Sequence, residues 1–176
     1  MNLPQKPYEG PIYYIVHAPK KFALPFFEDK DKKIMDANRK KIIDALKNAA
    51  TKGIPVIYEP GAERDTAEEI LDSLEKRPRV IWASGQEVAK VSSLRALMAR
   101  ENVVPKKIFS MGIYRNICVI TGAEFMRAAF PKAEIHIIGG ASTFFRGGPG
   151  RREAYRAQAN RYKIKLTKRL KPRHFA

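Results

Sequence analysis

The sequence predicts one α/β domain, a three-layer, doubly wound and mostly parallel sheet of about six strands flanked by helices. Short β-branched and aromatic runs alternate with amphipathic stretches along the chain, which is typical of strands joined by single helices. The 176 residues contain no internal repeat and are enough to bury a core without disulfide or metal support. We therefore take residues 1–176 as a single domain that includes a basic helix, strand and tail at 146–176.

The first strand is predicted at 12–16, a run of tyrosine, isoleucine and valine that reads as buried on both faces. Pro19 ends it, because proline cannot continue a central strand. Residues 20–27 mix prolines and aromatics with neither helical nor strand period, so they form a loop and a candidate pocket wall. Apolar residues between 35 and 52 then recur on one helical face.

The second strand is predicted at 54–58, with its proline near the start, where a missing N–H matters least. A capping-box pattern opens a short helix at 66–74. The third strand follows at 79–83. A second capping box begins at Ser84, and the apolar residues of 88–98 then mark a helical face.

The fourth strand is predicted at 106–111, and the residues from 118 to 129 keep helical spacing after it. A fifth strand at 133–138 ends at two glycines. A polar helix covers about 151–160, and the alternating residues 162–167 are typical of an edge strand.

Cys118 is the only cysteine of the chain and is predicted in the first turn of the helix after the fourth strand. Backbone N–H groups and the positive end of the helix dipole would push a thiol there toward the thiolate. The alternative is that Cys118 is a small buried hydrophobic residue. A lone cysteine forms no internal disulfide, which fits a reducing compartment.

His17 is predicted at the end of the first strand, as Cys118 is after the fourth. Ligands of open parallel sheets bind beyond the carboxyl ends of the strands, near the point where strand order reverses. If the two strands are neighbours, His17 can act as the base for a Cys118 nucleophile, and the N–H groups at the helix start can form an oxyanion hole. The alternative is that His17 only ends a strand.

Residues 112–119 read Gly-Ile-Tyr-Arg-Asn-Ile-Cys-Val and are followed by a small-residue helix start at 121–123. This segment resembles the nucleophile segment of the isochorismatase-like cysteine hydrolases, the superfamily that includes nicotinamidases. The resemblance extends in element order over about 12–142. It implies that Cys118 attacks an amide or related carbon, that the backbone N–H groups of Tyr114 and Cys118 form the oxyanion hole, and that the peptide before Tyr114 is cis.

The chain also departs from the family pattern at several positions. The family's first strand ends in a catalytic aspartate, with a pocket-lining phenylalanine five residues later; Phe22 matches the phenylalanine, but His17 stands in place of the aspartate. Ile113 is expected to line the substrate pocket with Phe22. The catalytic lysine after the third strand is missing, and the nearest candidate is Lys90. The loop after the second strand lacks the histidines that hold metal in nicotinamidases, so we expect no metal and no cofactor.

The net charge of +16 is concentrated at the C-terminal end. Residues 146–176 contain eleven Lys and Arg and one Glu, a net charge of +10. Such a segment attracts phosphate backbones or other polyanions, although it can also be a solvated face that only aids solubility. This favours a second hypothesis: a catalytically inactive member of the fold that serves as an RNA-binding or structural component of a ribonucleoprotein. The residues expected to bind nucleic acid are Arg151, Arg152, Arg156, Arg161, Lys163, Lys165, Lys168 and Arg169.

No apolar run has the length of a signal peptide or a membrane span, so we expect a soluble, cytoplasmic protein with no membrane partner. The first hypothesis implies a small-molecule substrate with an amide or related carbonyl group. A homo-oligomer is compatible with both hypotheses.

Overall fold

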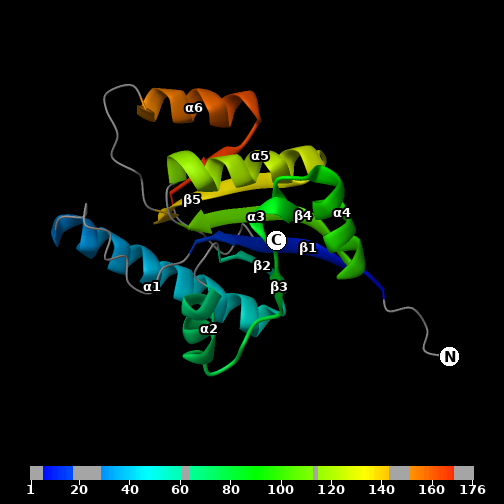
Figure 1. Cartoon of the computed structure of the whole chain (residues 1–176), viewed down its shortest axis with the longest axis horizontal. Coiled ribbons are helices and arrows are strands. Elements are labelled where there is room, and N and C mark those ends of the chain that lie inside the picture. Colours follow the sequence, from blue (N-terminus) through cyan, green and yellow to red (C-terminus); the bar gives the residue numbers. More distant parts are fainter. Residues whose placement is uncertain (1–5, 18–28, 61–63, 113–114, 143–150, 169–176) are drawn as a thin grey trace.

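The computed structural model describes residues 6–17, 29–60, 64–112, 115–142 and 151–168. A single sheet of six parallel strands runs through the middle, in the order β3-β2-β1-β4-β5-β6 (Figure 1). The strands are β1 (Tyr8–Val16), β2 (Val56–Glu59), β3 (Val80–Trp82), β4 (Val103–Gly112), β5 (Glu134–Ser142) and β6 (Lys165–Thr167). The predicted fold class is confirmed, and all the strand pairs are parallel.

Helices cover both faces of the sheet, which gives the three predicted layers (Figure 1). One face carries α1 (Asp29–Lys52) and α2 (Arg64–Asp72), whose apolar residues pack on the side chains of Tyr13 and Ile15. The opposite face carries α3 (Gly85–Val88), α4 (Val91–Arg100), α5 (Ile120–Ala129) and α6 (Arg151–Arg161). In the described part of the chain, no helix is both long and apolar enough to cross a membrane.

The two central strands are longer than the sequence predicts. β1 begins at Tyr8 and β4 at Val103, because the strands pair with each other from these residues to Val16 and Gly112. Residues Gly10 and Pro11 look like a strand boundary in the sequence, but they form an irregularity in the pairing and the strand continues. Long-range pairing of this kind leaves no local signal.

Three other predicted elements differ in detail. The helix expected at 88–98 is two helices, α3 and α4. The edge strand expected from position 162 begins only at Lys165, because Lys163 takes a left-handed backbone with φ of 52° after α6. Before α5, residues Arg115–Val119 form the π-helix η1, so Cys118 lies in a π-helical turn and not in the first turn of an α-helix.

Candidate active site

The two central strands place the candidate site where the sheet reverses its strand order. β1 and β4 are neighbours, and the helices that follow them, α1 and α5, lie on opposite faces. This is the switch point at which open parallel sheets bind ligands. His17 follows β1 and η1 follows β4, so the predicted neighbourhood of these two strand ends is confirmed.

Gly112 allows the two strand ends to approach. Its φ of +138° is a conformation that favours glycine, and a Cβ there would lie 1.9 Å from the Val16 carbonyl oxygen. Val16 and Gly112 are paired residues at the ends of β1 and β4. Any side chain at position 112 would therefore push the cysteine segment away from β1.

Cys118 is a free, partly buried thiol that packs against the apolar core on the α5 side of the sheet. Burial raises the pKa of this thiol, and the Glu59 carboxylate raises it further, while a hydrogen bond from the cysteine's own backbone N–H acts in the opposite direction. The prediction that the helix start lowers this pKa is therefore wrong in direction. The resting thiol is protonated at neutral pH.

Glu59 is the acidic group of the site, and sequence reasoning missed it. It is the last residue of β2 and pairs with Val16, so its half-buried side chain lies at the carboxyl edge of the sheet. The Tyr14 hydroxyl donates a hydrogen bond to Glu59 Oε2. The rule that placed His17 at a strand end applies equally to Glu59, so the signal was present in the sequence.

The Tyr14 side chain lies between the Glu59 carboxylate and α5, the helix that follows Cys118. Its side chain is fully buried, and burial, then Glu59, then Cys118 raise its pKa, so the phenol is a neutral donor. A Cβ on Gly122 would lie 2.4 Å from the Tyr14 hydroxyl oxygen. Cys118 precedes Gly122 by four residues, which is about one helical turn. The Tyr14 hydroxyl, the Glu59 carboxylate and the Cys118 thiol therefore form one cluster, in which Glu59 raises the pKa of both other groups.

His17 lies beside this cluster through its backbone. Its N–H donates to the Glu59 carbonyl oxygen at 2.9 Å, and its φ of 48° is a left-handed conformation that is uncommon outside glycine. Strained backbone of this kind is found at functional sites. In the described residues, no hydrogen bond joins the His17 ring to Cys118; the charged group that acts on the thiol is Glu59.

Several predicted site residues lie outside the described residues: Phe22, Ile113 and Tyr114, and with them the expected cis peptide and the Tyr114 N–H of the oxyanion hole. Lys90 is exposed and precedes α4. Ser84, which follows β3, caps α3 by a reciprocal pair of hydrogen bonds with Glu87. Within the described ranges, no group of three His, Cys, Asp or Glu side chains is placed to hold a metal ion.

The comparisons with known proteins concern the fold. No protein-family profile matches the chain, and no curated protein matches its sequence. The chain is similar to the structure of N-carbamoylsarcosine amidase from Thermoplasma acidophilum, with 14% identity and a TM-score of 0.58 over 92% of this chain and 99% of the other. It is also similar to an isochorismatase from Pseudomonas putida, with 16% identity and a TM-score of 0.59 over 94% and 91%.

A nicotinamidase from Staphylococcus aureus gives a third likeness, with 10% identity and a TM-score of 0.58 over 92% of this chain and 99% of the other. The chain has the isochorismatase-like fold. The same fold is found in an octameric hydrolase of unknown specificity from Escherichia coli, with 14% identity and a TM-score of 0.58 over 94% and 79%. At these identities the likeness concerns the architecture, which confirms the fold implied by the resemblance of the cysteine segment.

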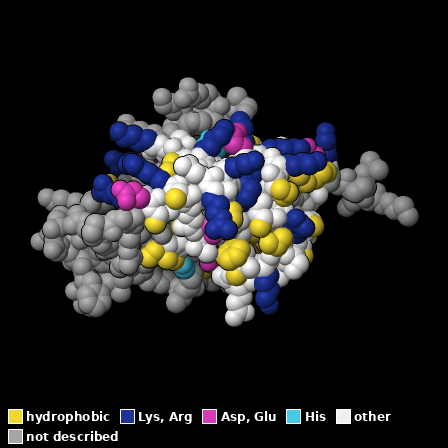
Figure 2. Space-filling model, turned by 90° about the horizontal axis from the view of Figure 1, so that it is seen from above, with side chains coloured by type: hydrophobic (Ala, Val, Ile, Leu, Met, Phe, Trp, Pro, Cys, Tyr) yellow, Lys and Arg dark blue, Asp and Glu magenta, His cyan; other side chains and the backbone are white. Residues whose placement is uncertain are grey.

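The basic residues at the C-terminal end of this isochorismatase-like fold lie on and after α6. Figure 2 views the α6 side of the molecule and shows many Lys and Arg side chains with few acidic ones. Arg151 begins α6, and Arg169 lies outside the described residues. The basic residues that the structure shows as exposed are Arg152, Arg156, Arg161, Lys163, Lys165 and Lys168.

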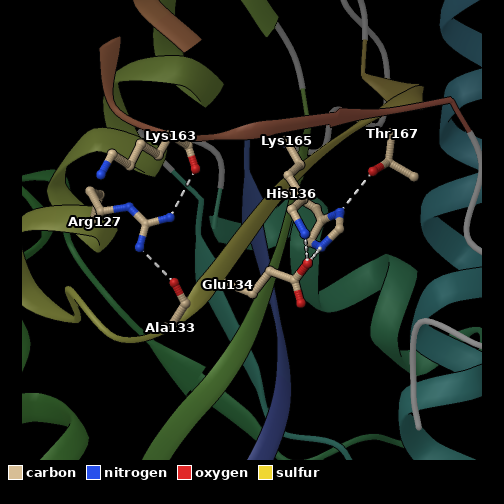
Figure 3. A network of polar contacts seen from close by, with 7 residues as sticks. All are labelled: Arg127, Ala133, Glu134, His136, Lys163, Lys165 and Thr167. Atoms are coloured by element: carbon tan, nitrogen blue, oxygen red, sulfur yellow. Dashed lines mark hydrogen bonds and ion pairs between the residues drawn. The ribbon is translucent and has the colours of Figure 1, made fainter. Parts of the chain in front are cut away.

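A network of hydrogen bonds and ion pairs connects the turn after α6 and strand β6 to α5 and β5 (Figure 3). The Arg127 guanidinium of α5 donates to the carbonyl oxygens of Ala133 at 2.6 Å and Lys163 at 3.0 Å, and also to those of Pro131 and Tyr162. On the next strands, Lys165 pairs with Glu134, whose carboxylate also lies 3.1 Å from His136 Nε2. Lys165 is therefore exposed, but its ammonium group already forms an ion pair with Glu134.

Proposed function

We propose that the chain is a cysteine hydrolase that acts on a small amide or related carbonyl substrate, with Cys118 as the nucleophile. The observation that supports this best is the geometry of the switch point, where Glu59 ends β2 beside Val16, Tyr14 donates to its carboxylate, and Cys118 follows the neighbouring strand β4. A nucleophilic thiol with an adjacent base is the arrangement that acyl transfer requires. The π-helical turn around Cys118 is a further feature that is frequent at functional sites.

In this proposal the thiol loses its proton as it attacks, because its pKa is raised in the resting protein. The sulfur forms a bond to the carbonyl carbon, the carbonyl π electrons move to oxygen, and the thiol proton passes to Glu59. The tetrahedral intermediate then expels the amine, which takes the proton from Glu59, and a thioester remains on Cys118. Water, deprotonated by Glu59, releases the acid and restores the thiol.

Tyr14 is a positioning residue in this scheme. Its hydroxyl occupies Glu59 Oε2 and leaves the other carboxylate oxygen available for the thiol proton. The backbone N–H groups of Cys118 and Tyr114 remain the proposed oxyanion hole. Phe22 and Ile113 remain the proposed pocket walls.

His17 is the second candidate for the base, since its backbone adjoins Glu59 and a neutral imidazole can accept the thiol proton. The two candidates make different predictions for single variants. If Glu59 is the base, Glu59→Gln abolishes turnover and His17→Ala retains most of it. If His17 is the base, the outcome is reversed.

The test is a panel of small amides and esters, assayed by ammonia or alcohol release with the wild type, Cys118→Ser, Glu59→Gln and His17→Ala. Glu134→Gln is the matched control, because Glu134 is also a half-buried glutamate of a parallel strand, but it is the first residue of β5 and so lies at the opposite edge of the sheet from Glu59. We expect Cys118→Ser and Glu59→Gln to lose at least about 100-fold in kcat/KM and Glu134→Gln to lose less than about twofold. Equal turnover in all of the variants would refute the proposal.

A second candidate function is that of a catalytically inactive RNA-binding component, and the exposed basic residues on and after α6 favour it. Binding of this kind weakens steeply as salt rises. Deleting the chain from Tyr162 would also remove β6 and the Ile164 core contact, so point variants of exposed arginines are the better test. Salt-independent or undetectable RNA binding would count against this function. The octameric hydrolase of the same fold supports a test of oligomeric state by sedimentation.

A further inference from the structure

A hollow of about 520 Å³ lies on the α6 side of the sheet, apart from the Tyr14–Glu59 cluster. Its walls are the carboxyl half of β5, the end of β6 and the first two turns of α6. Volumes of this size hold small organic ligands. The hydrolase proposal does not use this site. The RNA-binding candidate includes its basic residues but no pocket, and a ligand site here extends that candidate.

The hollow has a cationic rim. Arg152 and Arg156 are four residues apart, so they project from the same side of α6, and Lys168 faces them from the end of β6. All three side chains are exposed. No acidic side chain occurs among the described residues that line the hollow. An anion placed there meets several positive charges from two elements.

The floor of the hollow is glycine backbone at Gly139 and Gly140. The Gly140 N–H donates to the Lys168 carbonyl oxygen at 3.0 Å, and a Cβ on Gly140 would lie 2.7 Å from that oxygen. Lys41 of α1 reaches the same place from the other face, with its Nζ 3.4 Å from that Cβ position. Glycine at position 140 therefore allows the Lys168 backbone to lie this close to β5.

The hollow also has an apolar wall. Leu166 is 45% exposed, one of the few large hydrophobic side chains that the described structure leaves in water. Tyr155 and Ile137 continue the wall toward the core. Cations at the rim with an apolar wall fit a ligand that joins an anionic group to a flat or apolar body.

We propose that this hollow binds a nucleotide, with the phosphate between Arg152, Arg156 and Lys168 and the base or ribose against Leu166. Guanidinium groups suit phosphate oxygens because they offer paired donors. The α6 helix also begins at this rim, which adds its positive dipole end. The nucleotide is either free or a unit of single-stranded RNA, and the two sources share this chemistry.

The walls of the site are held by the polar network of Figure 3. Thr167 lines the hollow and its hydroxyl lies 2.7 Å from His136 Nδ1, while Arg127 fixes the turn between α6 and β6 through the Tyr162 and Lys163 carbonyl oxygens. The backbone that carries the rim is therefore attached to β5 and α5.

The test measures binding by the full chain to three probes: inorganic phosphate, AMP and a fluorescein-labelled 12-nucleotide uridine RNA, at about 50 mM salt. The variants are Arg156→Gln, which removes a positive charge from the rim, and Arg100→Gln, which removes one exposed positive charge from α4 and does not line the hollow. Isothermal titration calorimetry measures the binding of phosphate and AMP, and fluorescence anisotropy measures the binding of the labelled RNA. Circular dichroism checks that both variants fold.

We expect Arg156→Gln to weaken binding of AMP or RNA at least about tenfold and Arg100→Gln to weaken it less than about threefold. Leu166→Asp should also lose at least about tenfold, since it places a negative charge on the apolar wall. Comparable binding of AMP and RNA identifies free nucleotides as ligands, and binding of RNA alone identifies nucleic acid; both support the site. Equal losses in the two arginine variants, phosphate binding as tight as AMP binding, or no binding of any probe would overturn it.

Discussion

The hydrogen bond between Tyr14 and Glu59 can be tested by a series of three Tyr→Phe variants. Tyr13, Tyr14 and Tyr58 are each at most 1% exposed, so the three substitutions remove the same hydroxyl from equally buried rings. Their partners differ. Tyr14 donates to a carboxylate, and Tyr13 accepts from Asn48 Nδ2 at 2.8 Å. The Tyr58 hydroxyl has no hydrogen-bond partner in the described part of the chain.

These partners set the expected order of stability losses. Hydrogen bonds to charged groups are worth about 1.5–3 kcal/mol, and Glu59 is only half-buried and can regain water, so we expect Tyr14→Phe to cost about 2 kcal/mol. The neutral bond of Tyr13 predicts about 1 kcal/mol for Tyr13→Phe. Removing the unpaired Tyr58 hydroxyl should cost nothing or stabilise by up to about 1 kcal/mol, because a desolvated polar group is lost.

The assay is urea unfolding at pH 7 and 25 °C, with the free energy of unfolding taken from the transition midpoint at constant slope. Only Tyr14→Phe should also lower turnover, because only Tyr14 holds the Glu59 carboxylate. If Tyr14→Phe costs no more stability than Tyr58→Phe, the reasoning about this cluster is wrong.

Three further predictions concern the C-terminal half. The hydrogen bond from Lys165 is the main cause that lowers the Glu134 pKa below its value in the unfolded chain, and His136 adds a smaller effect in the same direction. The stability that results is present above about pH 4.5 and is lost as pH falls through the lower pKa of the folded state. The stability advantage of the wild type over Glu134→Gln should shrink between about pH 5 and pH 3 in urea titrations, and a constant advantage would contradict this. Arg127→Met should cost about 3 kcal/mol in urea unfolding because four carbonyl oxygens lose their donor, and a cost below about 0.5 kcal/mol would refute it. Lys163→Gly should raise the free energy of unfolding by about 0.5–1 kcal/mol, since φ is 52° there. A lower free energy of unfolding would show that the lysine side chain matters more than its backbone.

The order of elements could be predicted because each buried strand leaves a local signal. Runs such as 12–16 and 133–138 are β-branched and lie between amphipathic segments, so the α/β class and the position of the cysteine segment follow from the sequence. The rule for switch points then brought the ends of β1 and β4 together correctly. The added length of β1 and β4 came from their mutual pairing, which no local pattern records.

The chemistry of the site could be predicted only in part. The sequence predicts the position of Cys118 but not the direction of its pKa shift. The helix dipole alone would lower this pKa, whereas burial and the Glu59 carboxylate raise it. Glu59 directly follows the predicted second strand, so the rule for strand ends applies to it, but only the pairing of β2 with β1 places it beside Val16. The π-helical turn has no distinct period in five residues, so periodicity could not separate η1 from α5.

The most direct test of the account is the pH dependence of Cys118 alkylation by iodoacetamide, followed by intact-protein mass, in the wild type and in Glu59→Gln. Only the thiolate reacts, and the negative charge of Glu59 raises the pKa of Cys118. We expect Glu59→Gln to shift the alkylation profile to lower pH, so that this variant is alkylated faster at pH 8 although it has lost turnover. Superimposable profiles would contradict the claim that Glu59 and Cys118 form one reaction centre.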